Sequence, residues 1–376
     1  MIAPLSVPLL LFQLAVPRLD PSFAPIEDFV TRGIRQGVYP GAVVVVGRSD
    51  SILYARGFGR LTWSAASPTP RADSTRWDLA SLTKVIATTS ALMVLVDRHQ
   101  VDLDAPVVKY LPGFDGEKRR RITVRMLLDH TSGLRAYVAL YQQAPTRAEA
   151  ISQLYREQPV RVPGTGAVYS DINAMLLGLL VEAVTGESLS SFSAREVFVP
   201  LRLSATGFAP SLSLQSSIAP SRMVSGRPVP GRVDDANALR LGGVAGHAGL
   251  FATGIDVARF AQAWLHGGTV GDSSWVSSRV MREFLQRSRR SGTRVLGWDT
   301  PDQSSRQPSI FGALAGARTY GHTGWTGTML WVDPERDLFL VFLTNRSLAP
   351  RVRNSLTVLR GIRSSLSDLV IRLTRR

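Results

Sequence analysis

The sequence contains no cysteine among its 376 residues. Without thiols the chain can form neither a disulfide framework nor a thiolate metal site. Lysine is nearly absent as well, because only three of the 44 Lys and Arg residues are lysines, namely Lys84, Lys109 and Lys118. A lysine that is kept against this background is a candidate for a specific chemical task.

Several catalytic signatures are also missing. The chain has no Gly-x-Ser-x-Gly, which leaves the nucleophile elbow of an α/β-hydrolase unsupported. It has no His-Glu-x-x-His and no paired aspartate ladder, so we expect no metal, and we expect no cofactor either. With 44% hydrophobic and 19% charged residues, the composition is that of a globular protein rather than a disordered one.

Acidic residues are outnumbered, since 29 Asp and Glu face 44 Lys and Arg and leave a net charge of +15. Basic clusters lie at 118–121, 287–294 and 346–376. Nucleic-acid binding is one interpretation, but no zinc knuckle, RNP-like aromatic run or phosphate loop accompanies the charge. We therefore expect no nucleic-acid partner and favour a solvated basic face that associates weakly with an anionic membrane or cell-wall polymer.

Long apolar runs are lacking too, and the nearest approach to one lies at the N-terminus. Residues 2–16 are almost wholly apolar, which is too short to span a bilayer but suits the apolar region of a secretory signal. No Lys or Arg precedes this run, and no clean small-x-small cleavage site follows it. We interpret 1–24 as a signal or N-terminal apolar segment and expect an exported, periplasmic or cell-envelope protein, with a cytoplasmic location as the alternative.

Strand patterns occur near both ends of the chain. Residues 41–61 indicate two strands around a turn at 47–50, because β-branched residues fill the first arm and alternation marks the second. Residues 328–345 indicate a second hairpin, with its turn at 333–336. Neither hairpin could bury a face alone, so we expect both to share one antiparallel sheet.

Helical periodicity fills much of the remaining sequence, with apolar residues at helical spacing in 82–99, 172–184, 255–268 and 352–373. We expect a fold of the α/β (α+β) class, in which helices flank an antiparallel sheet formed from both chain ends and the middle is a mostly helical subdomain. Residues 25–376 would then form a single domain, with its sheet part in about 25–75 and 240–376 and its helical part in about 76–239.

The helix predicted at 82–99 begins beside a serine and a lysine that share one face, because Ser81 and Lys84 are one helical turn apart. A serine hydroxyl is a weak nucleophile until a base takes its proton, and a buried lysine can be that base or hold a partner's proton in place. At a helix N-terminus, Ser81 would also lie near unpaired N–H groups that can bind an oxyanion. Taken alone, the pair is better explained by a helix-capping serine and an unrelated surface lysine.

Two further stretches change that balance. In 162–186 a Gly-rich turn precedes Tyr-Ser-Asp at 169–171, and a tyrosine near a lysine can serve as acid and base. In 320–346 the triplet His-Thr-Gly at 322–324 stands at the start of a strand. Such a strand can lie beside an acyl substrate and bind its carboxylate, because glycine there allows the backbone to approach closely.

Together these three motifs, in this order, resemble those of the class C serine β-lactamases and their penicillin-binding and esterase relatives, the peptidase S12 group. The stretches 101–114, 127–134 and 242–262 are also similar to segments common in that family. The resemblance runs from about residue 25 to about residue 370. It implies a β-lactamase/transpeptidase-like fold and a serine hydrolase that forms an acyl-enzyme with D-amino-acid peptides, β-lactams or small esters.

The resemblance implies roles for the candidate catalytic residues. Ser81 would be the acylated nucleophile and Lys84 would support it. Tyr169 would be the general base or proton shuttle. The backbone N–H groups of Ser81 and of Trp325, the residue after Gly324, would form the oxyanion hole.

The resemblance also implies substrate contacts, in which His322 and Thr323 would face the substrate's carboxylate. Two departures from the family's pattern fall here. Asp171 stands where the family often has Asn, so Asn173 is the alternative source of that amide. His322 stands where the family often has Lys, and His at this position occurs in family members with esterase or peptidase activity. Both departures argue against true β-lactamase activity.

Two other histidines remain as weaker candidates. His130, in Asp-His-Thr-Ser-Gly-Leu, could be a catalytic base, but a capped turn before Gly133 is the better explanation. His247 lies in a Gly-rich loop that could border the cleft, and the sequence leaves its role open.

The expected partner is a small-molecule or peptidoglycan-derived substrate, and we expect a monomer. The rival function from another class is a non-catalytic penicillin-recognition or sensor protein of the same fold, which would be marked by loss of Ser81, Lys84 or Tyr169. All three residues are present. The sequence does not rank peptide, lactam and ester as substrates.

Overall fold

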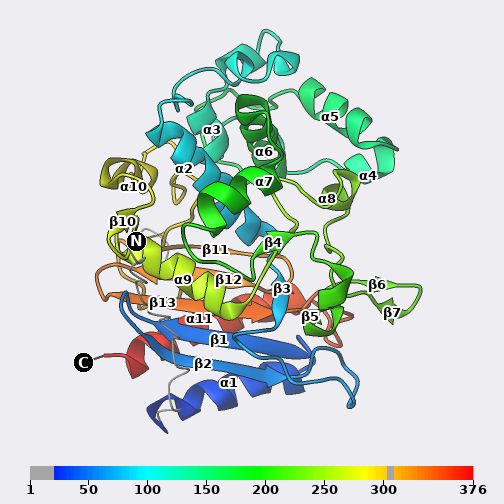
Figure 1. The fold of residues 1–376 in the computed structure, drawn as a ribbon, viewed down its shortest axis with the longest axis vertical. Helices are drawn as coiled ribbons and strands as arrows, with labels where there is room; N and C mark the ends of the chain where they lie inside the picture. Colours follow the sequence, from blue (N-terminus) through cyan, green and yellow to red (C-terminus); the bar gives the residue numbers. More distant parts are fainter. Residues whose placement is uncertain (1–20, 303–308, 376) are drawn as a thin grey trace, which may run out of the picture.

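The computed structural model describes residues 21–302 and 309–375, so most of the expected signal segment lies outside the described residues. Figure 1 shows a helical lobe standing on a β-sheet, with helices along the sheet. The expected class, an antiparallel sheet flanked by helices with a largely helical middle, is confirmed.

The main sheet has five strands in the order β11-β12-β13-β1-β2, with every neighbouring pair antiparallel. Its strands are β1 (Gly41–Gly47), β2 (Ile52–Gly59), β11 (Tyr320–Thr323), β12 (Met329–Asp333) and β13 (Leu338–Thr344). The two hairpins meet where β1 pairs with β13, with Ala42 opposite Thr344 and Gly47 opposite Phe339. The prediction that both chain ends build one sheet is therefore confirmed.

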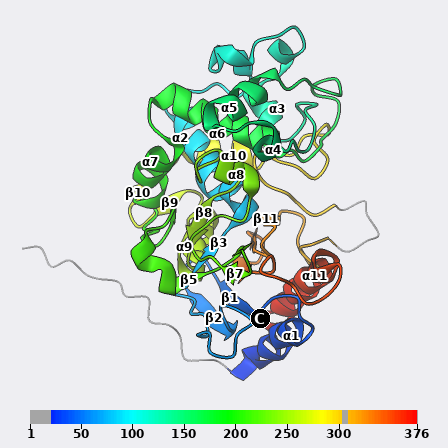
Figure 2. The same cartoon turned by 90° about the vertical axis from the view of Figure 1, so that its right-hand side faces the viewer.

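Helices cover both faces of this sheet because β1 buries side chains on both sides. Val43 and Val45 belong to a core shared with α9 (Gly254–Leu265), whereas Val44 and Val46 belong to a second core. That second core is completed by α1 (Ala24–Arg35) and α11 (Ser355–Leu373), which lie side by side along one face of the sheet in Figure 2. The predicted helices 255–268 and 352–373 correspond to α9 and α11.

The helical lobe is centred on two apolar helices. The segment expected at 82–99 is a 3-10 turn η2 (Ala80–Leu82), a π-helical stretch η3 (Lys84–Thr89) and α2 (Ser90–Asp97). Residues 80–97 are long and apolar enough to cross a membrane by composition, but 89% of them are buried inside the protein, as in a core helix. The helix expected at 172–184 is α6 (Asp171–Thr185), which ends at the left-handed Gly186.

The other helices are short and mostly surround these two. They are α3 (Val124–Leu128), α4 (Leu140–Gln143), α5 (Arg147–Arg156), α7 (Leu189–Ser193), α8 (Ala236–Arg240) and α10 (Ser278–Phe284). Further 3-10 or π turns are η1 (Pro21–Phe23), η4 (Val107–Lys109), η5 (Pro112–Phe114), η6 (Arg119–Arg121), η7 (Ala194–Phe198) and η8 (Leu212–Ser217).

A second, four-stranded sheet joins the lobe to the main sheet and was not predicted. Its order is β4 (Gly207–Phe208), β8 (Leu250–Ala252), β3 (Arg76–Asp78) and β5 (Ile218–Ala219). Strands of two or three residues are too short for alternation to mark them. Two-stranded ribbons are formed by β6 (Met223–Val224) with β7 (Arg227–Pro228), and by β9 (Thr269–Val270) with β10 (Ser273–Ser274). Five of these strands, namely β3, β4, β5, β6 and β7, fall within the part expected to be helical, about 76–239.

Candidate active site

Ser81 lies in the turn that leads from β3 into the buried helix. Ala80 before it has φ 47°, a left-handed conformation that is strained for a residue with a Cβ. The turn is held because Asp78 Oδ1 accepts the Ala80 N–H at 3.0 Å. The Thr326 hydroxyl, from the β11–β12 connection, also donates to the Asp78 carbonyl at 2.7 Å. The turn that carries Ser81 and the end of β11 are thereby tied together.

Lys84 is buried beneath Ser81, with 4% of its side chain exposed. Its Nζ donates to Ser81 Oγ at 2.9 Å and to the His247 carbonyl at 3.3 Å, and it lies 2.7 Å from Asp171 Oδ1. An ammonium group has three donors and no acceptor. These three partners therefore match a charged lysine.

The charge on Lys84 follows from its neighbours. Burial alone lowers the pKa of Lys84, but the Asp171 carboxylate and the Tyr169 oxygen outweigh burial and leave the pKa above its ordinary value. The interpretation of Lys84 as a neutral base that takes the serine proton therefore does not fit the structure. Lys84 is placed to orient Ser81 as a cation, which leaves proton removal to another group.

Tyr169 lines the same cleft as Ser81 and is the candidate for removing the serine proton. The Lys84 Nζ lies 4.9 Å from the centre of the Tyr169 ring, and the Arg294 guanidinium carbon lies 4.8 Å from it. Two cations thus lie against one aromatic ring, a contact that stabilises the position of the ring. The sequence did not point to Arg294, because an isolated arginine forms no motif.

His130 holds the backbone beside Tyr169. Its Nδ1 accepts the N–H of Ser170 at 3.1 Å, and its ring centre lies 4.9 Å from that of Tyr169. Burial, with the Arg294 and Lys84 charges adding, keeps the pKa of His130 well below its usual range, so the ring stays neutral and Nδ1 remains an acceptor. This is a structural role in a turn, as the sequence favoured, and His130 does not line the cleft.

The two candidates for the family's Asn position separate clearly. Asp171 lines the cleft and pairs with Lys84. Asn173 is fully buried, with its Oδ1 accepting from the Ser132 hydroxyl at 2.7 Å and its Nδ2 donating to the Leu127 carbonyl at 3.2 Å. The expectation that Asn173 contacts substrate is therefore corrected, because its position on α6, two residues after the cleft-facing Asp171, turns its amide into the core.

His322 is neutral in this site. Its Nδ1 lies 2.9 Å from the Thr323 carbonyl, which can only accept, so Nδ1 carries the ring proton. Burial, with Arg294 and Lys84 adding, keeps the pKa of His322 well below its usual range. The Nε2 atom is then a buried acceptor with no protein partner in the described ranges. A cationic His322 that pairs with a substrate carboxylate is therefore not supported.

The two N–H groups expected to form the oxyanion hole, those of Ser81 and Trp325, belong to the two turns that are tied together. Gly324 N–H donates to the Thr328 carbonyl at 2.8 Å, which closes the turn after β11. A Cβ on Gly324 would lie 2.6 Å from the Leu79 carbonyl, so only glycine lets this turn approach the one that carries Ser81. Trp325 follows, with 57% of the residue exposed at the cleft.

His247 does border the cleft, which answers the question the sequence left open. Its Nε2 lies 2.9 Å from Asp235 Oδ1, and its backbone carbonyl accepts from Lys84. Burial raises the pKa of Asp235, but the contact with His247 outweighs burial and holds the pKa below its usual range. The pair fixes the loop whose carbonyl binds the lysine.

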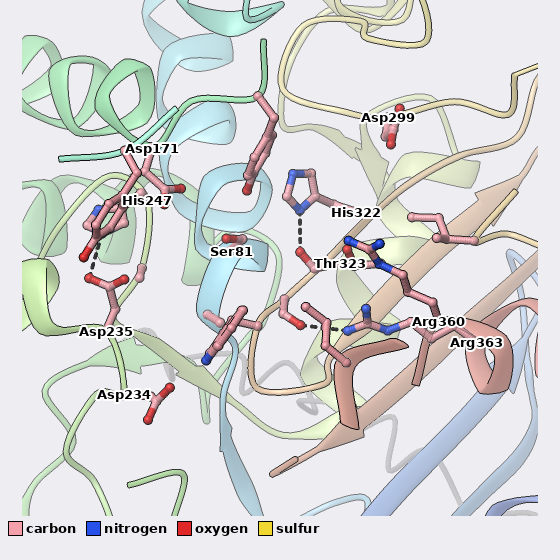
Figure 3. A pocket seen from close by; sticks show the side chains of 18 of the residues that line it. Ser81, Asp171, Asp234, Asp235, His247, Asp299, His322, Thr323, Arg360 and Arg363 are labelled. Atoms are coloured by element: carbon pink, nitrogen blue, oxygen red, sulfur yellow. Dashed lines mark hydrogen bonds and ion pairs between the residues drawn. The ribbon is translucent and has the colours of Figure 1, made fainter. Parts of the chain in front are cut away.

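These residues surround a cleft of about 1260 Å³. Figure 3 shows Ser81 between two walls, with Asp171, Asp235 and Asp234 on one side and Arg360 and Arg363 on the other. Thr323 lies on the arginine side, at the end of β11. Within residues 21–302 and 309–375, no three His, Asp or Glu side chains come together as a metal site would require.

Comparison with known proteins agrees with this geometry. Residues 26–361 match the family described as Beta-lactamase. The chain belongs to that family. It is 32% identical over 348 residues to "Putative D-alanyl-D-alanine carboxypeptidase" of Escherichia coli K12, covering 83% of this chain and 80% of the relative. It is also 32% identical over 364 residues to "N-acetylmuramyl-L-alanine amidase" of Bacillus subtilis 168, covering 86% and 81%.

Solved structures of similar fold extend the family likeness. "EstCE1, a hydrolase with promiscuous acyltransferase activity" superposes with a TM-score of 0.73 at 21% identity, over 91% of this chain and 98% of that one. A "family VIII carboxylesterase" gives a TM-score of 0.69 at 20% identity, over 94% and 98%. At these identities the likeness concerns the fold. Together with the family match, the predicted class is confirmed: this β-lactamase-family protein is a serine hydrolase.

Proposed function

We propose that this β-lactamase-family hydrolase cleaves an acyl bond through an acyl-enzyme on Ser81, with a peptidoglycan-derived peptide that ends in a D-amino-acid carboxylate as its substrate. The observation that carries the proposal is the Lys84 ammonium, which joins Ser81 to Asp171 beneath the Tyr169 ring. Tyr169 would take the Ser81 proton as the hydroxyl attacks, and return it to the leaving amine.

The charge of the cleft supports a substrate that bears a carboxylate. The acidic wall is partly offset, because Asp171 pairs with Lys84. Burial and the neighbouring Asp78 carboxylate also raise the pKa of Asp234 to about 7, so it is only partly charged near neutral pH. On the opposite wall Arg360 is exposed, and no ion pair to it is found in the described part of the chain. The cleft therefore favours an anionic group on the arginine side.

Labelling tests the acyl-enzyme. We expect a fluorescent penicillin to add its mass to the wild-type protein, and Ser81→Ala to abolish that adduct while leaving the melting temperature nearly unchanged. Intact mass and peptide mapping give both readings. Labelling of Ser81→Ala at the wild-type rate would show that the nucleophile is another residue, and the proposal would fail.

A small neutral ester is the second candidate substrate, and it is favoured by the neutral His322 in place of a cation. Arg360→Gln separates the two. We expect kcat/KM for a D-alanyl-D-alanine peptide to fall roughly fivefold, since one exposed cation contributes about 1 kcal/mol to such a contact. The value for p-nitrophenyl acetate should stay within about twofold, because that ester carries no carboxylate. Equal effects on both substrates would favour the ester.

Export remains part of the proposal, because peptidoglycan peptides lie outside the cytoplasm. It predicts recovery of the protein in the envelope or periplasmic fraction. The names of the matched relatives give no support to the non-catalytic alternative. We also propose a monomer, which light scattering in solution can check.

A further inference from the structure

Arg363 is a buried cation that the chemistry described so far does not use. It lies on α11, near the C-terminal end of the chain, and only 3% of the residue is exposed. No carboxylate lies within ion-pair distance of it in the described ranges, and its Nε has no partner there. Burial, with Arg346 and Arg360 adding, lowers the pKa of Arg363 to about 9, which still leaves it charged near neutral pH. A buried cation without a counter-ion is costly, so its contacts need an explanation.

The contacts of Arg363 converge on the turn after β11. Its Nη2 donates to the Gly324 carbonyl at 2.7 Å and to the Thr328 carbonyl at 2.8 Å. These carbonyls stand at the two ends of the turn that carries Trp325. Figure 3 shows Arg363 on the Thr323 side of the cleft, across from Asp171. The guanidinium therefore clamps the turn from the side opposite the acidic wall.

One of these carbonyls belongs to the peptide group that matters for catalysis. The Gly324 C=O and the Trp325 N–H are the two ends of a single planar peptide unit, and they point in opposite directions. A cation bonded to the C=O fixes the plane of this unit and polarises it, which makes its N–H a stronger donor. The Trp325 N–H is the one expected to bind the oxyanion that forms at the Ser81 ester.

Arg346 provides an internal comparison. It is also buried, at 4% exposed, and its Nε donates to the Trp325 carbonyl at 2.9 Å while its guanidinium packs 4.6 Å from the Trp325 ring centre. That carbonyl belongs to the next peptide unit, whose N–H is that of Thr326. Arg346 therefore holds the same turn without touching the peptide unit whose N–H faces the oxyanion.

We propose that Arg363 is a positioning residue of the oxyanion hole, which orients and polarises the Gly324–Trp325 peptide. The proposal rests on acyl transfer at Ser81. It predicts that Arg363 acts on the transition state and on the acyl-enzyme carbonyl rather than on substrate binding. It also gives a reason for a charged group buried without a counter-ion.

The test compares Arg363→Gln and Arg363→Lys with Arg346→Gln and Arg346→Lys, using p-nitrophenyl acetate. We expect Arg363→Gln to lower kcat by roughly tenfold to a hundredfold, somewhat less than the loss of a whole oxyanion donor, with KM within about twofold. The inhibition constant of a boronic acid that mimics the tetrahedral intermediate should rise by the same factor. Arg346→Gln should lower the melting temperature but leave the ratio of that inhibition constant to KM unchanged.

Infrared spectroscopy measures the ester carbonyl band, which should not shift if Arg363 has a purely structural role. With a ¹³C=O-labelled acyl group on Ser81, the ester carbonyl band of Arg363→Gln should shift to higher wavenumber than in the wild type, because its hydrogen bond is weaker. The Arg346 variants should keep the wild-type band. Should Arg363→Gln fail to fold, Arg363→Lys decides, since it keeps the cation but replaces the guanidinium, whose Nη2 donates to both carbonyls, with a shorter side chain.

The outcomes separate the two proposals. If Ser81 is acylated in every variant but the Arg363 and Arg346 variants show the same band and the same kcat, the role of Arg363 is overturned and the acyl-enzyme stands. If the wild type forms no adduct on Ser81, the acyl-enzyme proposal fails and the oxyanion role falls with it.

Discussion

Lys84 shows how much one residue's chemistry depends on what lies around it. A hydroxyl, a carbonyl and a carboxylate surround its ammonium nitrogen as acceptors, so no donor faces Lys84 that would need the lone pair of a neutral amine. Asp171 stands where the family often has Asn. Its carboxylate raises the pKa of Lys84 and so keeps the lysine protonated. In this chain the lysine and the aspartate form one unit.

Asp171→Asn tests that unit through pH. Without the carboxylate, burial still lowers the pKa of Lys84 and its strongest opposing partner is gone, so the pKa of Lys84 should fall below the wild-type value. If the ammonium is the active form, kcat/KM of the variant for p-nitrophenyl acetate should drop as pH rises through this lowered pKa. The wild type should stay flat over the same range.

The matched control is Glu182→Gln on the same helix, where the carboxylate pairs with Arg147 instead. Its pH profile should match the wild type. An Asp171→Asn enzyme that gains activity as pH rises would mean that the neutral amine is the working form, against the assignment made here.

Among single residues, the sequence pointed to Ser81, Lys84, Tyr169 and Asp171, but it did not predict the protonation state of each. The one-turn spacing brings the serine and the lysine together whatever the rest of the fold does. Charge states depend on burial and on partners from distant segments, such as Arg294 beside Tyr169, and no local pattern encodes them. Asn173 failed as a candidate because two positions along a helix turn the side chain to a different face.

Among the elements, the closest approach at the site is between α6 and the loop before β8. A Cβ on Gly246 would lie 2.0 Å from the Ala174 carbonyl of α6, so backbone meets backbone there. The Gly246 carbonyl also accepts from the Thr88 hydroxyl at 2.8 Å, and the next carbonyl, that of His247, accepts from Lys84. Packing of α6 therefore sets where one of the lysine's acceptors stands.

Gly246→Ala should push this loop away from α6. We expect a loss of about 1–3 kcal/mol in the free energy of unfolding, typical of overpacking, together with a lower kcat because the His247 carbonyl moves off Lys84. Urea denaturation and steady-state kinetics measure both. Gly207→Ala is the control, because a Cβ there meets nothing within 4 Å. Equal stability of the two variants would contradict this account of the packing.

Long elements in which apolar residues recur at regular spacing could be predicted from the sequence, and short elements could not. Both hairpins and the helices α6, α9 and α11 follow from residues that repeat at strand or helix spacing. The π-helical turns at Lys84–Thr89 and the two-residue strands β4 and β5 depend on tertiary contacts instead. The helical period in 82–99 predicts a helix but not its π-helical part, and no period marks the two short strands.

Over the whole molecule, one apolar core crosses from the main sheet into the helical lobe. It joins Val43 of β1 to Leu92 of α2 and Leu176 of α6. We therefore expect sheet and lobe to unfold together. Near-ultraviolet circular dichroism and far-ultraviolet ellipticity should report the same urea midpoint. Two separated midpoints would divide the chain into two folding units and count against a single domain.

The pairing of β1 with β13 has a consequence for how the protein is made. The partner of Ala42 is Thr344, so about 300 residues must leave the ribosome before the centre of the sheet can close. At about 5–20 residues per second, the first hairpin waits roughly 15–60 s with one edge open. During that interval the nascent chain has no closed main sheet, so chaperones can bind it and it can be threaded through a narrow channel. The Trp325 peptide and Arg363 are translated long after Ser81, so a nascent chain that stops before them lacks the turn and the cation described beside Ser81.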